Sequence, residues 1–331
     1  MRITPRVTSC LSLLALAALA ALFIGCGDDD APAGPATPAG ADIYVDSPNG
    51  SDVDGTGSAQ NPYKTITKAL SEAQNGDVVT VQPGIYDTPN GETFPITIPD
   101  GVTLQGTDWT RCTIKVDAEA LGVRNAVVVS CDDCAIRNFT LEEEKITNPF
   151  VTYFVNVTGS NFALVDSLRT LQRTIYGAMR IDTDTGSTIQ NCYFNDSEAG
   201  YHERGIAVFG NGFDSNTTLR SLTVTGYLRG IVFAAPQNTL VEWCTLSGND
   251  MGVELCCYGD ASTQPNPDFG GGARGGVGQN DFSGNASYGI LNGTRHTIYA
   301  KFNTWAHNPP TSGVDYWNSD EAGGGNIIWQ F

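Results

Sequence analysis

The segment Ile189-Gln190-Asn191-Cys192-Tyr193-Phe194 carries apolar side chains at its first, fourth and sixth positions, and this pattern recurs along the chain. Side chains alternate along a straight strand, so an odd spacing followed by an even one requires a bend between two short strands. The clearest other copies are Ile136-Phe139-Leu141, Leu219-Leu222-Val224 and Val241-Cys244-Leu246, and weaker copies are Val165-Leu168-Thr170, Val277-Asn280-Phe282 and Tyr299-Phe302-Thr304. Successive copies begin 22 to 36 residues apart, a repeat that is typical of a solenoid.

Two further features recur with each copy. Polar residues, Asn138, Asn191 and Ser221, precede the second apolar member and are expected to stack at the bend. Strand-like segments that begin with a glycine, at Gly205, Gly230, Gly252 and Gly289, follow the copies and are expected to start with a turn. We therefore predict an all-β fold, a single-stranded right-handed parallel β-helix. An antiparallel sandwich, the alternative, would need hairpin turns about every 8 to 12 residues.

Both ends of the predicted solenoid carry candidate caps. Ile66, Ala69, Leu70 and Ala73 fall at helical spacing after Thr65, a suitable N-cap, which predicts a short amphipathic helix over the first coil. Such a helix would cover the unpaired edge of the first strand. At the other end, Trp305, Trp317 and Trp329 predict an irregular cap, although three tryptophans could also line a sugar site.

The N-terminus has the composition of a secretory signal. Arg2 and Arg6 precede an apolar run over residues 11–24, which is shorter than the roughly 20 residues that span a bilayer. The run ends in Leu22-Phe23-Ile24-Gly25-Cys26, which resembles a bacterial lipobox and implies cleavage before a lipidated Cys26. Phe23 departs from the usual leucine, so an ordinary secretory signal is the alternative.

These patterns divide the chain into a lipoprotein signal peptide (1–25), a tether rich in Asp, Pro, Gly and Ala (26–41) and a β-helix domain (42–331). Within the domain we distinguish an opening and cap (42–106), coils (107–304) and a C-terminal cap (305–331). A lipid anchor predicts an exported protein held on the bacterial membrane. Gly27 after the cysteine favours the outer membrane or cell surface.

The chain is acidic, with a formal net charge of -18 at pH 7. A surface of this sign repels phosphate backbones, which argues against nucleic-acid binding. Of the nine cysteines, seven follow Cys26, and their pairing is left open: Cys112, Cys131, Cys134, Cys192, Cys244, Cys256 and Cys257. The Cys131–Cys134 spacing favours a small disulfide loop or two packed thiols over a redox or metal site.

The opening of the domain resembles a known family. The relevant segments are Ile43-Tyr44-Val45-Asp46, Gly50-Ser51-Asp52, residues 61–66, residues 76–81 and Gly84-Ile85-Tyr86. They resemble the uncharacterised domain that begins many exported bacterial right-handed β-helix proteins of the pectin-lyase-like superfamily. The resemblance covers roughly Ile43 to Gly106 and implies an extracellular β-helix often associated with polysaccharide. It implies no single activity, because fold is a weak guide to chemistry.

One cluster of charged residues is the best candidate for catalysis. Arg180, Asp182 and Asp184 alternate and so share one face of a strand, and Asp196, His202 and Glu203 follow about one coil later. Equivalent residues of neighbouring coils stack about 4.8 Å apart, which would let carboxylates from two coils meet. A glycosidase needs two such carboxylates, and a lyase needs a base and a positive charge. A solvated strand and turn with ordinary charges is the alternative interpretation.

Calcium is the only cofactor that the sequence suggests. Asp46, Asp52 and Asp54 before Gly55 faintly resemble a calcium loop but lack its distal glutamate. Asp132 and Asp133 resemble the paired aspartates of related lyases, but the further acid is replaced by Ile136 or Arg137. Turn-forming aspartates explain both groups equally well.

Three functions remain open from the sequence. The first is a surface β-helix lipoprotein that binds a glycan or a surface protein, or presents a structural surface, without catalysis. The second is a polysaccharide lyase or glycoside hydrolase that acts on an acidic polysaccharide through the carboxylates around Asp182 and Glu203. The third, an accessory metal-binding protein, is disfavoured because the chain has three histidines and three methionines.

Overall fold

A computed structural model of the chain describes residues 40–116, 125–143, 153–171, 177–182, 185–196, 202–209, 216–234, 238–256, 265–318 and 325–330. For His202 it describes the backbone only. All of these residues belong to one compact unit, Ala39–Phe331. Within the described ranges, no helix is both long and apolar enough to cross a membrane.

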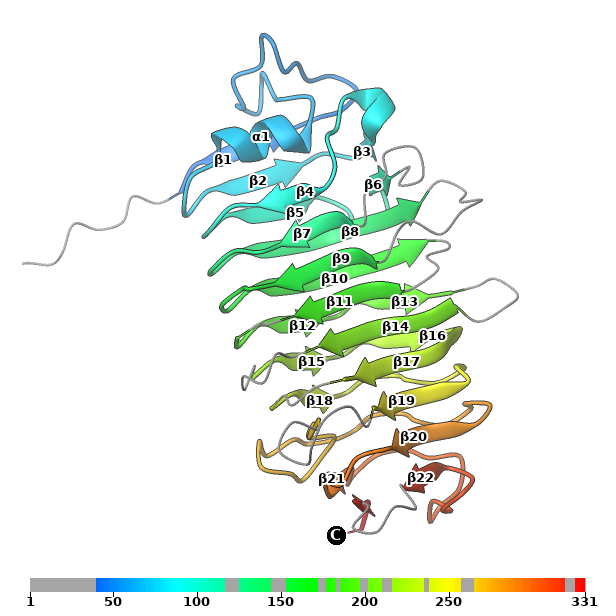
Figure 1. The fold of residues 1–331 in the computed structure, drawn as a ribbon. Helices are drawn as coiled ribbons and strands as arrows, with labels where there is room; N and C mark the ends of the chain where they lie inside the picture. The colour runs from blue at the N-terminus through cyan, green and yellow to red at the C-terminus, as the bar shows by residue number, and fades with distance from the viewer. Residues whose placement is uncertain are drawn as a thin grey trace, which may run out of the picture. The chain divides into compact units, whose positions relative to one another are not determined.

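The unit winds into parallel coils stacked along one axis, which confirms the predicted right-handed parallel β-helix (Figure 1). One sheet has twelve strands: β1 (Asp42–Val45), β2 (Val78–Val81), β3 (Gly84–Tyr86), β5 (Thr103–Gly106), β6 (Cys112–Val116), β8 (Ala135–Glu143), β10 (Leu164–Leu171), β12 (Thr188–Gln190), β13 (Tyr193–Asn195), β15 (Thr218–Arg220), β16 (Thr223–Thr225) and β18 (Leu240–Glu242). A second sheet has nine: β4 (Ile96–Ile98), β7 (Asn125–Val129), β9 (Tyr153–Thr158), β11 (Gly177–Asp182), β14 (His202–Phe209), β17 (Tyr227–Phe233), β19 (Met251–Leu255), β20 (Tyr288–Asn292) and β22 (Tyr316–Asn318). The short strands β21 (Ile298–Tyr299) and β23 (Ile327–Ile328) pair with each other, and a 3-10 turn, η1, spans Thr88–Asn90.

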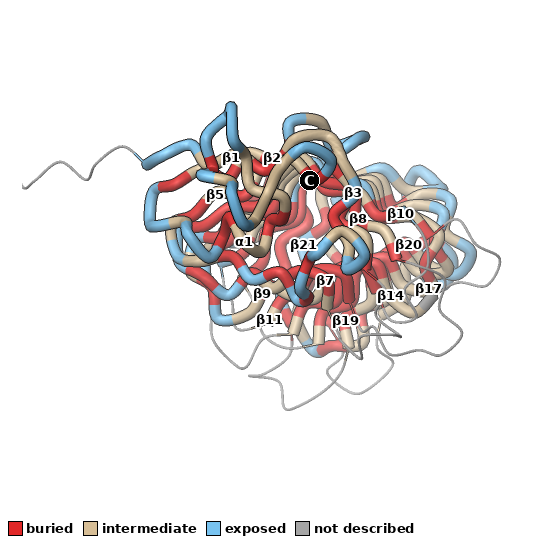
Figure 2. The backbone as a smooth tube through the Cα atoms, turned by 90° about the horizontal axis from the view of Figure 1, so that it is seen from above, coloured by how far each residue is buried: buried red, intermediate tan, exposed pale blue. Residues whose placement is uncertain are grey.

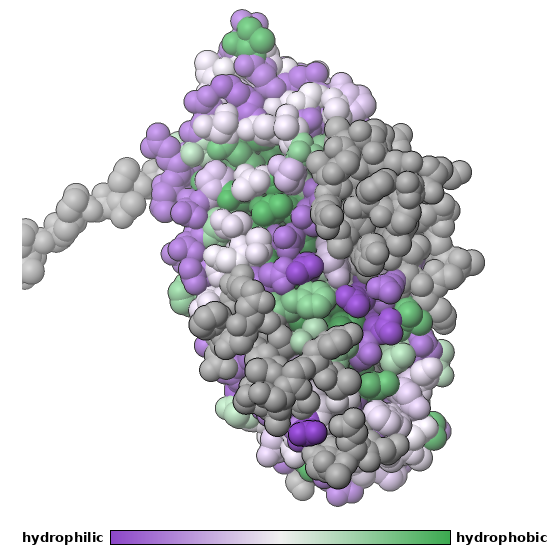
Figure 3. Space-filling model, in the orientation of Figure 1, coloured by the Kyte–Doolittle hydropathy of each residue, from purple (hydrophilic) through white to green (hydrophobic). Residues whose placement is uncertain are grey.

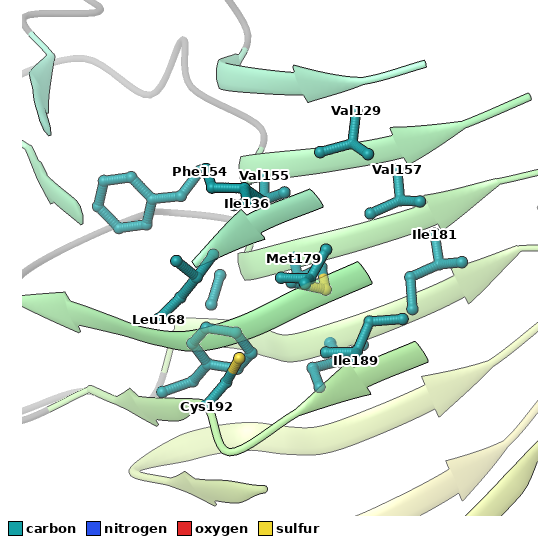
Figure 4. Close-up of a cluster of buried hydrophobic side chains, with 14 of the residues drawn as sticks. Val129, Ile136, Phe154, Val155, Val157, Leu168, Met179, Ile181, Ile189 and Cys192 are labelled. Carbon is teal, nitrogen blue, oxygen red and sulfur yellow. The ribbon is translucent and has the colours of Figure 1, made fainter. Parts of the chain in front are cut away.

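Stacked apolar side chains fill the space between the sheets (Figure 4), and Figure 2 colours long stretches of the strands as buried. In the nine-stranded sheet, Val127, Val155, Met179 and Ile206 are register partners on successive coils, and all are fully buried. Parallel pairing places like residues above one another, so each inward position becomes an apolar column along the axis. The core is therefore one continuous cluster rather than separate pockets of packing.

The predicted bend lies in the twelve-stranded sheet. Asn138, Asn191 and Ser221 have φ values of 64°, 54° and 53°, in the left-handed region. Asparagine tolerates this region, whereas most other side chains pay roughly 1–2 kcal/mol for it. Register places seven such residues in one column, one per coil: Asn138, Ser167, Asn191, Ser221, Trp243, Gln279 and Phe302.

The predicted role of the glycines was wrong. Gly205 and Gly230 lie inside β14 and β17, and neither has a positive φ. A Cβ atom on Gly205 would lie 2.2 Å from Val224 Cγ1 and 2.7 Å from the Gly230 carbonyl oxygen. The strand bends inward here, with Gly205 and Ile206 both buried, so glycine is required for close packing rather than for a turn.

The repeat assignment was also wrong in the last two coils. Asp268 and Tyr299 are the register partners of Leu240, so Phe269 and Ala300 take the inward place of Val241. Val277, the predicted inward residue, is 46% exposed. The glycine-rich loop 270–278 is inserted between the strand and the bend, which breaks the spacing on which the prediction depended.

The two ends are covered largely as predicted. Helix α1 (Ile66–Glu72) has Thr65 as N-cap, whose side chain accepts a hydrogen bond from the Lys68 N–H. At the other end, the Trp305 ring centroid lies 5.1 Å from that of Phe282, and Trp329 Nε1 donates to Tyr316 Oη at 3.3 Å. Trp317 instead lies on β22 as the register partner of Leu291.

A buried acid holds the start of α1. The Glu92 carboxylate, 4% exposed, accepts hydrogen bonds from the N–H groups of Ile66 at 2.6 Å and Thr67 at 3.0 Å, and from the Thr67 hydroxyl at 2.7 Å. Burial raises the pKa of Glu92, and these hydrogen bonds offset only part of that effect.

The pH dependence of stability tests this arrangement. Because the folded state raises the pKa of Glu92, its contribution to stability is complete below the ordinary value of 4.5 and is lost as the pH rises through the raised value. The free energy of unfolding, measured in urea, should therefore rise for Glu92→Gln relative to the wild type as the pH is raised from about 4 to about 7. Glu72→Gln, at an exposed site on the same helix, should differ by less than about 0.5 kcal/mol throughout. A Glu92→Gln difference that is constant with pH would contradict the assignment.

The inserted loop is organised by one carboxylate. Asp268, 5% exposed, accepts hydrogen bonds from the N–H groups of Gly270, Gly272, Arg274 and Gly276 at 2.8 to 3.2 Å. The Arg274 guanidinium then donates to the carbonyl oxygens of Thr217 and Asn238 at 2.7 and 2.8 Å. The loop thus ties its own coil to two earlier ones.

Removal of this carboxylate should be costly. Asp268→Ala leaves four backbone N–H groups without their acceptor, and we expect a loss of about 3 to 5 kcal/mol in the free energy of unfolding. Formate should restore part of the loss, because a small anion can occupy the same nest of N–H groups. Asp281→Ala, which removes a single acceptor for Ser283 N–H, should cost about 1 kcal/mol. Equal losses in the two variants would show that the nest is not the stabilising element.

Candidate functional site

The outer face of the nine-stranded sheet carries three of the six predicted catalytic residues, Arg180, Asp182 and Glu203. Two outward columns cross it: one contains Tyr153, Arg204 and Arg229, and the other contains Asn156, Arg180, Ala207, Val232 and Glu254. The face seen in Figure 3 mixes strongly hydrophilic and hydrophobic side chains. Ala207 and Val232 are almost fully buried although they point away from the core cluster, so other side chains cover them.

Arg180 and Asp182 form a fork-to-carboxylate pair on β11. Arg180 Nε contacts Asp182 Oδ2, and Arg180 Nη2 donates to Asp182 Oδ1 at 3.1 Å. The Arg180 guanidinium carbon lies 4.7 Å from the centroid of the Phe209 ring. The ion pair and the ring together fix the orientation of the guanidinium.

Arg204 approaches the same ring from the next strand. Its guanidinium carbon lies 5.7 Å from the Phe209 centroid, and its side chain is hydrogen-bonded to the phenol of Tyr153. Burial raises the pKa of Tyr153, and the Arg204 hydrogen bond offsets only part of that effect, so the phenol is protonated at neutral pH. Arg180 and Arg204 therefore flank one aromatic ring.

Two polar atoms on this face have no hydrogen-bond partner among the described residues. Arg204 Nε is buried, and the Glu203 carboxylate oxygen lies 3.8 Å away, beyond hydrogen-bonding distance. Asn156 Oδ1, on the strand β9, is also buried, and no described residue donates to it. Arg229 extends the basic column by one coil and forms an ion pair with Glu254. Unsatisfied groups of this kind are expected where a ligand supplies the missing partner.

The structure brings together Arg180, Asp182 and Glu203 but not the whole predicted set. Asp196 is 8% exposed and directly follows β13, and its backbone lies against Gly226 of the next coil, at the corner that precedes β17. The backbone of His202 pairs with Tyr227, whereas its side chain lies outside the described residues, as does Asp184.

Sequence reasoning missed Tyr153, Asn156, Arg229 and Phe209 and did not select Arg204. Arg204 and Arg229 stand directly before Gly205 and Gly230 in successive strands, so the glycine repeat itself could have aligned them. Tyr153 gave no such signal, because it lies two coils before Arg204, and Phe209 gave none, because its contact with Arg180 depends on the pairing of β11 with β14.

The predicted calcium positions do not form a metal centre within the described ranges. Asp52 accepts hydrogen bonds from Lys64 N–H, Thr65 N–H and the Thr65 hydroxyl, and Asp46 accepts from Asn49. Asp132 accepts from both the backbone and side chain of Asn161. No three acidic, histidine or cysteine side chains among the described residues converge to share a cation. Asp54 and Asp133 therefore have no acidic partners there, and no step is assigned to calcium.

The cysteines outside this face have structural roles. Cys131 and Cys134 form a disulfide, one of the two arrangements that their spacing allowed. Cys112, Cys192 and Cys244 are buried thiols in the core, and burial raises the pKa of the Cys192 and Cys244 thiols to about 12. Cys26 lies outside the described residues.

The coils and their register place this chain among the right-handed parallel β-helix proteins. It belongs to the family described as Protein of unknown function (DUF1565), whose model matches residues 48–312.

Solved structures of low sequence identity share the fold. A rhamnogalacturonan lyase aligns with a TM-score of 0.53 and 14% identity over 84% of this chain and 80% of that chain. The pectate lyase Pel9A aligns with a TM-score of 0.54 and 15% identity over 80% of this chain and 70% of that chain. At these identities the similarity shows the fold alone. No curated protein sequence matches the chain.

Proposed function

We propose that this protein is a membrane-anchored surface lipoprotein that binds a carboxylate-bearing glycan, without catalysis, on the outer face of the nine-stranded sheet. The observation that carries the proposal is that two guanidinium groups, those of Arg180 and Arg204, lie 4.7 and 5.7 Å from the centroid of the Phe209 ring. Guanidinium forks match carboxylate geometry, and an aromatic ring offers an apolar surface to a sugar. Among the described residues, Asn156 Oδ1 and Arg204 Nε lack hydrogen-bond partners that glycan hydroxyl groups would supply.

The carboxylates of this face are poorly arranged for glycoside hydrolysis. A hydrolase needs one free acid and one free base on opposite sides of the bond. Both oxygens of Asp182 contact Arg180. Asp196 is buried at the corner that follows β13. The acids here orient arginines, which favours binding over hydrolysis.

A polysaccharide lyase is the second candidate, and the contact between Arg204 and Tyr153 favours it. In β-elimination, a base removes the proton alpha to the uronate carboxylate, a carbon–carbon double bond forms, and the glycosidic C–O bond breaks. A guanidinium would neutralise the carboxylate, and a protonated phenol could donate to the departing oxygen. The fold shared with two lyases is consistent with this chemistry but does not assign it.

Binding and turnover can be measured on the same variants. Arg204→Gln should weaken retention on a polygalacturonate gel by about 10- to 100-fold, because a charge-assisted hydrogen bond contributes about 1.5 to 3 kcal/mol. Arg220→Gln is the matched control, since Arg220 pairs with Glu242 on the other sheet and should leave retention unchanged. Equal retention of wild type and Arg204→Gln would refute the proposed face. An unsaturated product that disappears in Arg204→Gln would establish the lyase instead.

Anchorage is tested separately. The lipobox-like segment and the tether predict that acylated Cys26 holds the protein on the membrane, with the outer membrane favoured. Cys26→Ala should move the protein from the membrane fraction to the soluble exported fraction and abolish labelling by a fatty-acid analogue. Labelling that persists in Cys26→Ala would exclude this residue as the anchor.

A further inference from the structure

A second surface of the solenoid carries a feature that the fold does not explain. The column of left-handed residues at the bend has small polar side chains in the early coils. In the later coils it has Trp243 (φ 59°), Gln279 (φ 61°) and Phe302 (φ 64°). Trp243 and Phe302 are 54% and 41% exposed. We call Ser221, Trp243, Gln279 and Phe302 the corner strip.

Large aromatic side chains are poorly suited to these positions. Asparagine or serine adopts the left-handed region with less strain, as Asn138, Asn191 and Ser221 do in the same column. Because the tryptophan is exposed, burial of its side chain stabilises the fold too little to offset the backbone strain. Strained conformations that the surrounding register enforces are found preferentially at functional sites. Trp243 is enforced in this way, because its N–H donates to the Gly278 carbonyl oxygen of the next coil at 2.9 Å.

The form of the strip selects the kind of ligand. It is one residue wide and runs along the solenoid axis, with a pitch of about 4.8 Å per coil, so Trp243 and Phe302 stand about 10 Å apart. Half-exposed aromatic side chains offer on the order of 250 Å² here, well below the roughly 800 Å² per partner of a stable protein interface. A narrow linear surface instead fits a linear chain.

The chemistry of the strip is uncharged. Its four side chains carry no charge, although the whole protein has a net charge of -18. Aromatic faces attract the weakly positive C–H groups on the flat side of a sugar ring, and the Gln279 amide between them can bond hydroxyl groups. We propose that the corner strip binds a neutral β-linked glycan, extended across the coils that carry Trp243, Gln279 and Phe302.

This proposal goes beyond the function proposed for the arginine face and does not depend on it. The strip lies on the bend of the twelve-stranded sheet, whereas Arg180 and Arg204 lie on the nine-stranded sheet. Substitutions in the corner strip should therefore reduce the binding of neutral glycans alone, and substitutions on the arginine face should reduce the binding of acidic glycans alone.

Affinity electrophoresis of the full-length chain in mild detergent tests the strip, with hydroxyethyl cellulose, xylan and glucomannan as neutral probes and polygalacturonate as the acidic one. Trp243→Asn installs the residue type that earlier coils use at this position. It should weaken retention by a neutral probe at least about tenfold, as expected for loss of a central aromatic contact, while the midpoint of thermal unfolding stays equal or rises. Gln279→Ala should also weaken retention; because it removes the hydrogen bond from Gln279 Nε2 to the Phe302 carbonyl oxygen at 3.2 Å, its midpoint of thermal unfolding is measured as well. Trp109→Ala, at a 37% exposed tryptophan stacked on Arg169, and Arg204→Gln should leave neutral retention unchanged.

Three results would overturn the proposal. The first is no retention of the wild type by any neutral probe, and the second is equal retention of wild type, Trp243→Asn and Gln279→Ala. The third is dimerisation in sedimentation experiments that Trp243→Asn abolishes, without neutral-glycan retention, which would assign the strip to a second copy of the chain. Loss of polygalacturonate binding in Arg204→Gln bears only on the arginine face.

Discussion

Parallel hydrogen bonding between successive coils is the interaction on which the rest of this structure depends. It places each residue directly against its counterpart in the next coil, as in the column Val127, Val155, Met179 and Ile206. A side chain therefore acquires two neighbours of the same position, about 4.8 Å above and below. An apolar residue repeated at one position becomes a continuous core, and a charged one becomes a column of charge.

The same register explains how an acidic protein gathers several arginines on one face. Arg204 and Arg229 are neighbours only because β14 and β17 pair, and Arg180 joins them through β11. The small side chain of Ala207 lies between Arg204 and Phe209 on the same face, which leaves room for the guanidinium to reach the ring. Asp182 and Glu254 each hold an arginine, so the acids orient the cations that would bind a ligand.

Two kinds of bend shape the coils, and each makes a different demand on sequence. The bend in the nine-stranded sheet turns two successive residues inward, and Gly205 meets that demand because a Cβ would collide with Val224. The bend in the twelve-stranded sheet requires a positive φ, which Asn138 and Asn191 satisfy with little strain and Trp243 does not. A residue that fits a bend poorly, such as Trp243, thus indicates a role other than folding, since the fold itself does not require it.

The sequence by itself determined the fold class, the position of the bend and the N-terminal helix, because each depends on spacing between residues close in the chain. Local spacing failed at Val277, where an insertion intervened, and was shifted by one residue at Tyr299, where Ala300 is the buried residue. It misread Gly205 because a close approach between coils leaves no mark on local sequence. Only the tertiary structure decided the composition of the candidate site. Asp182 and Glu203 were identified from their clustering, but Asp196 lies at the corner after β13. Tyr153 reaches Arg204 from a strand two coils away, and Phe209 meets Arg180 through the pairing of β11 with β14, a register that no single segment encodes. The pairing of distant strands, which depends on the packing of the whole core, is the physical reason for this division.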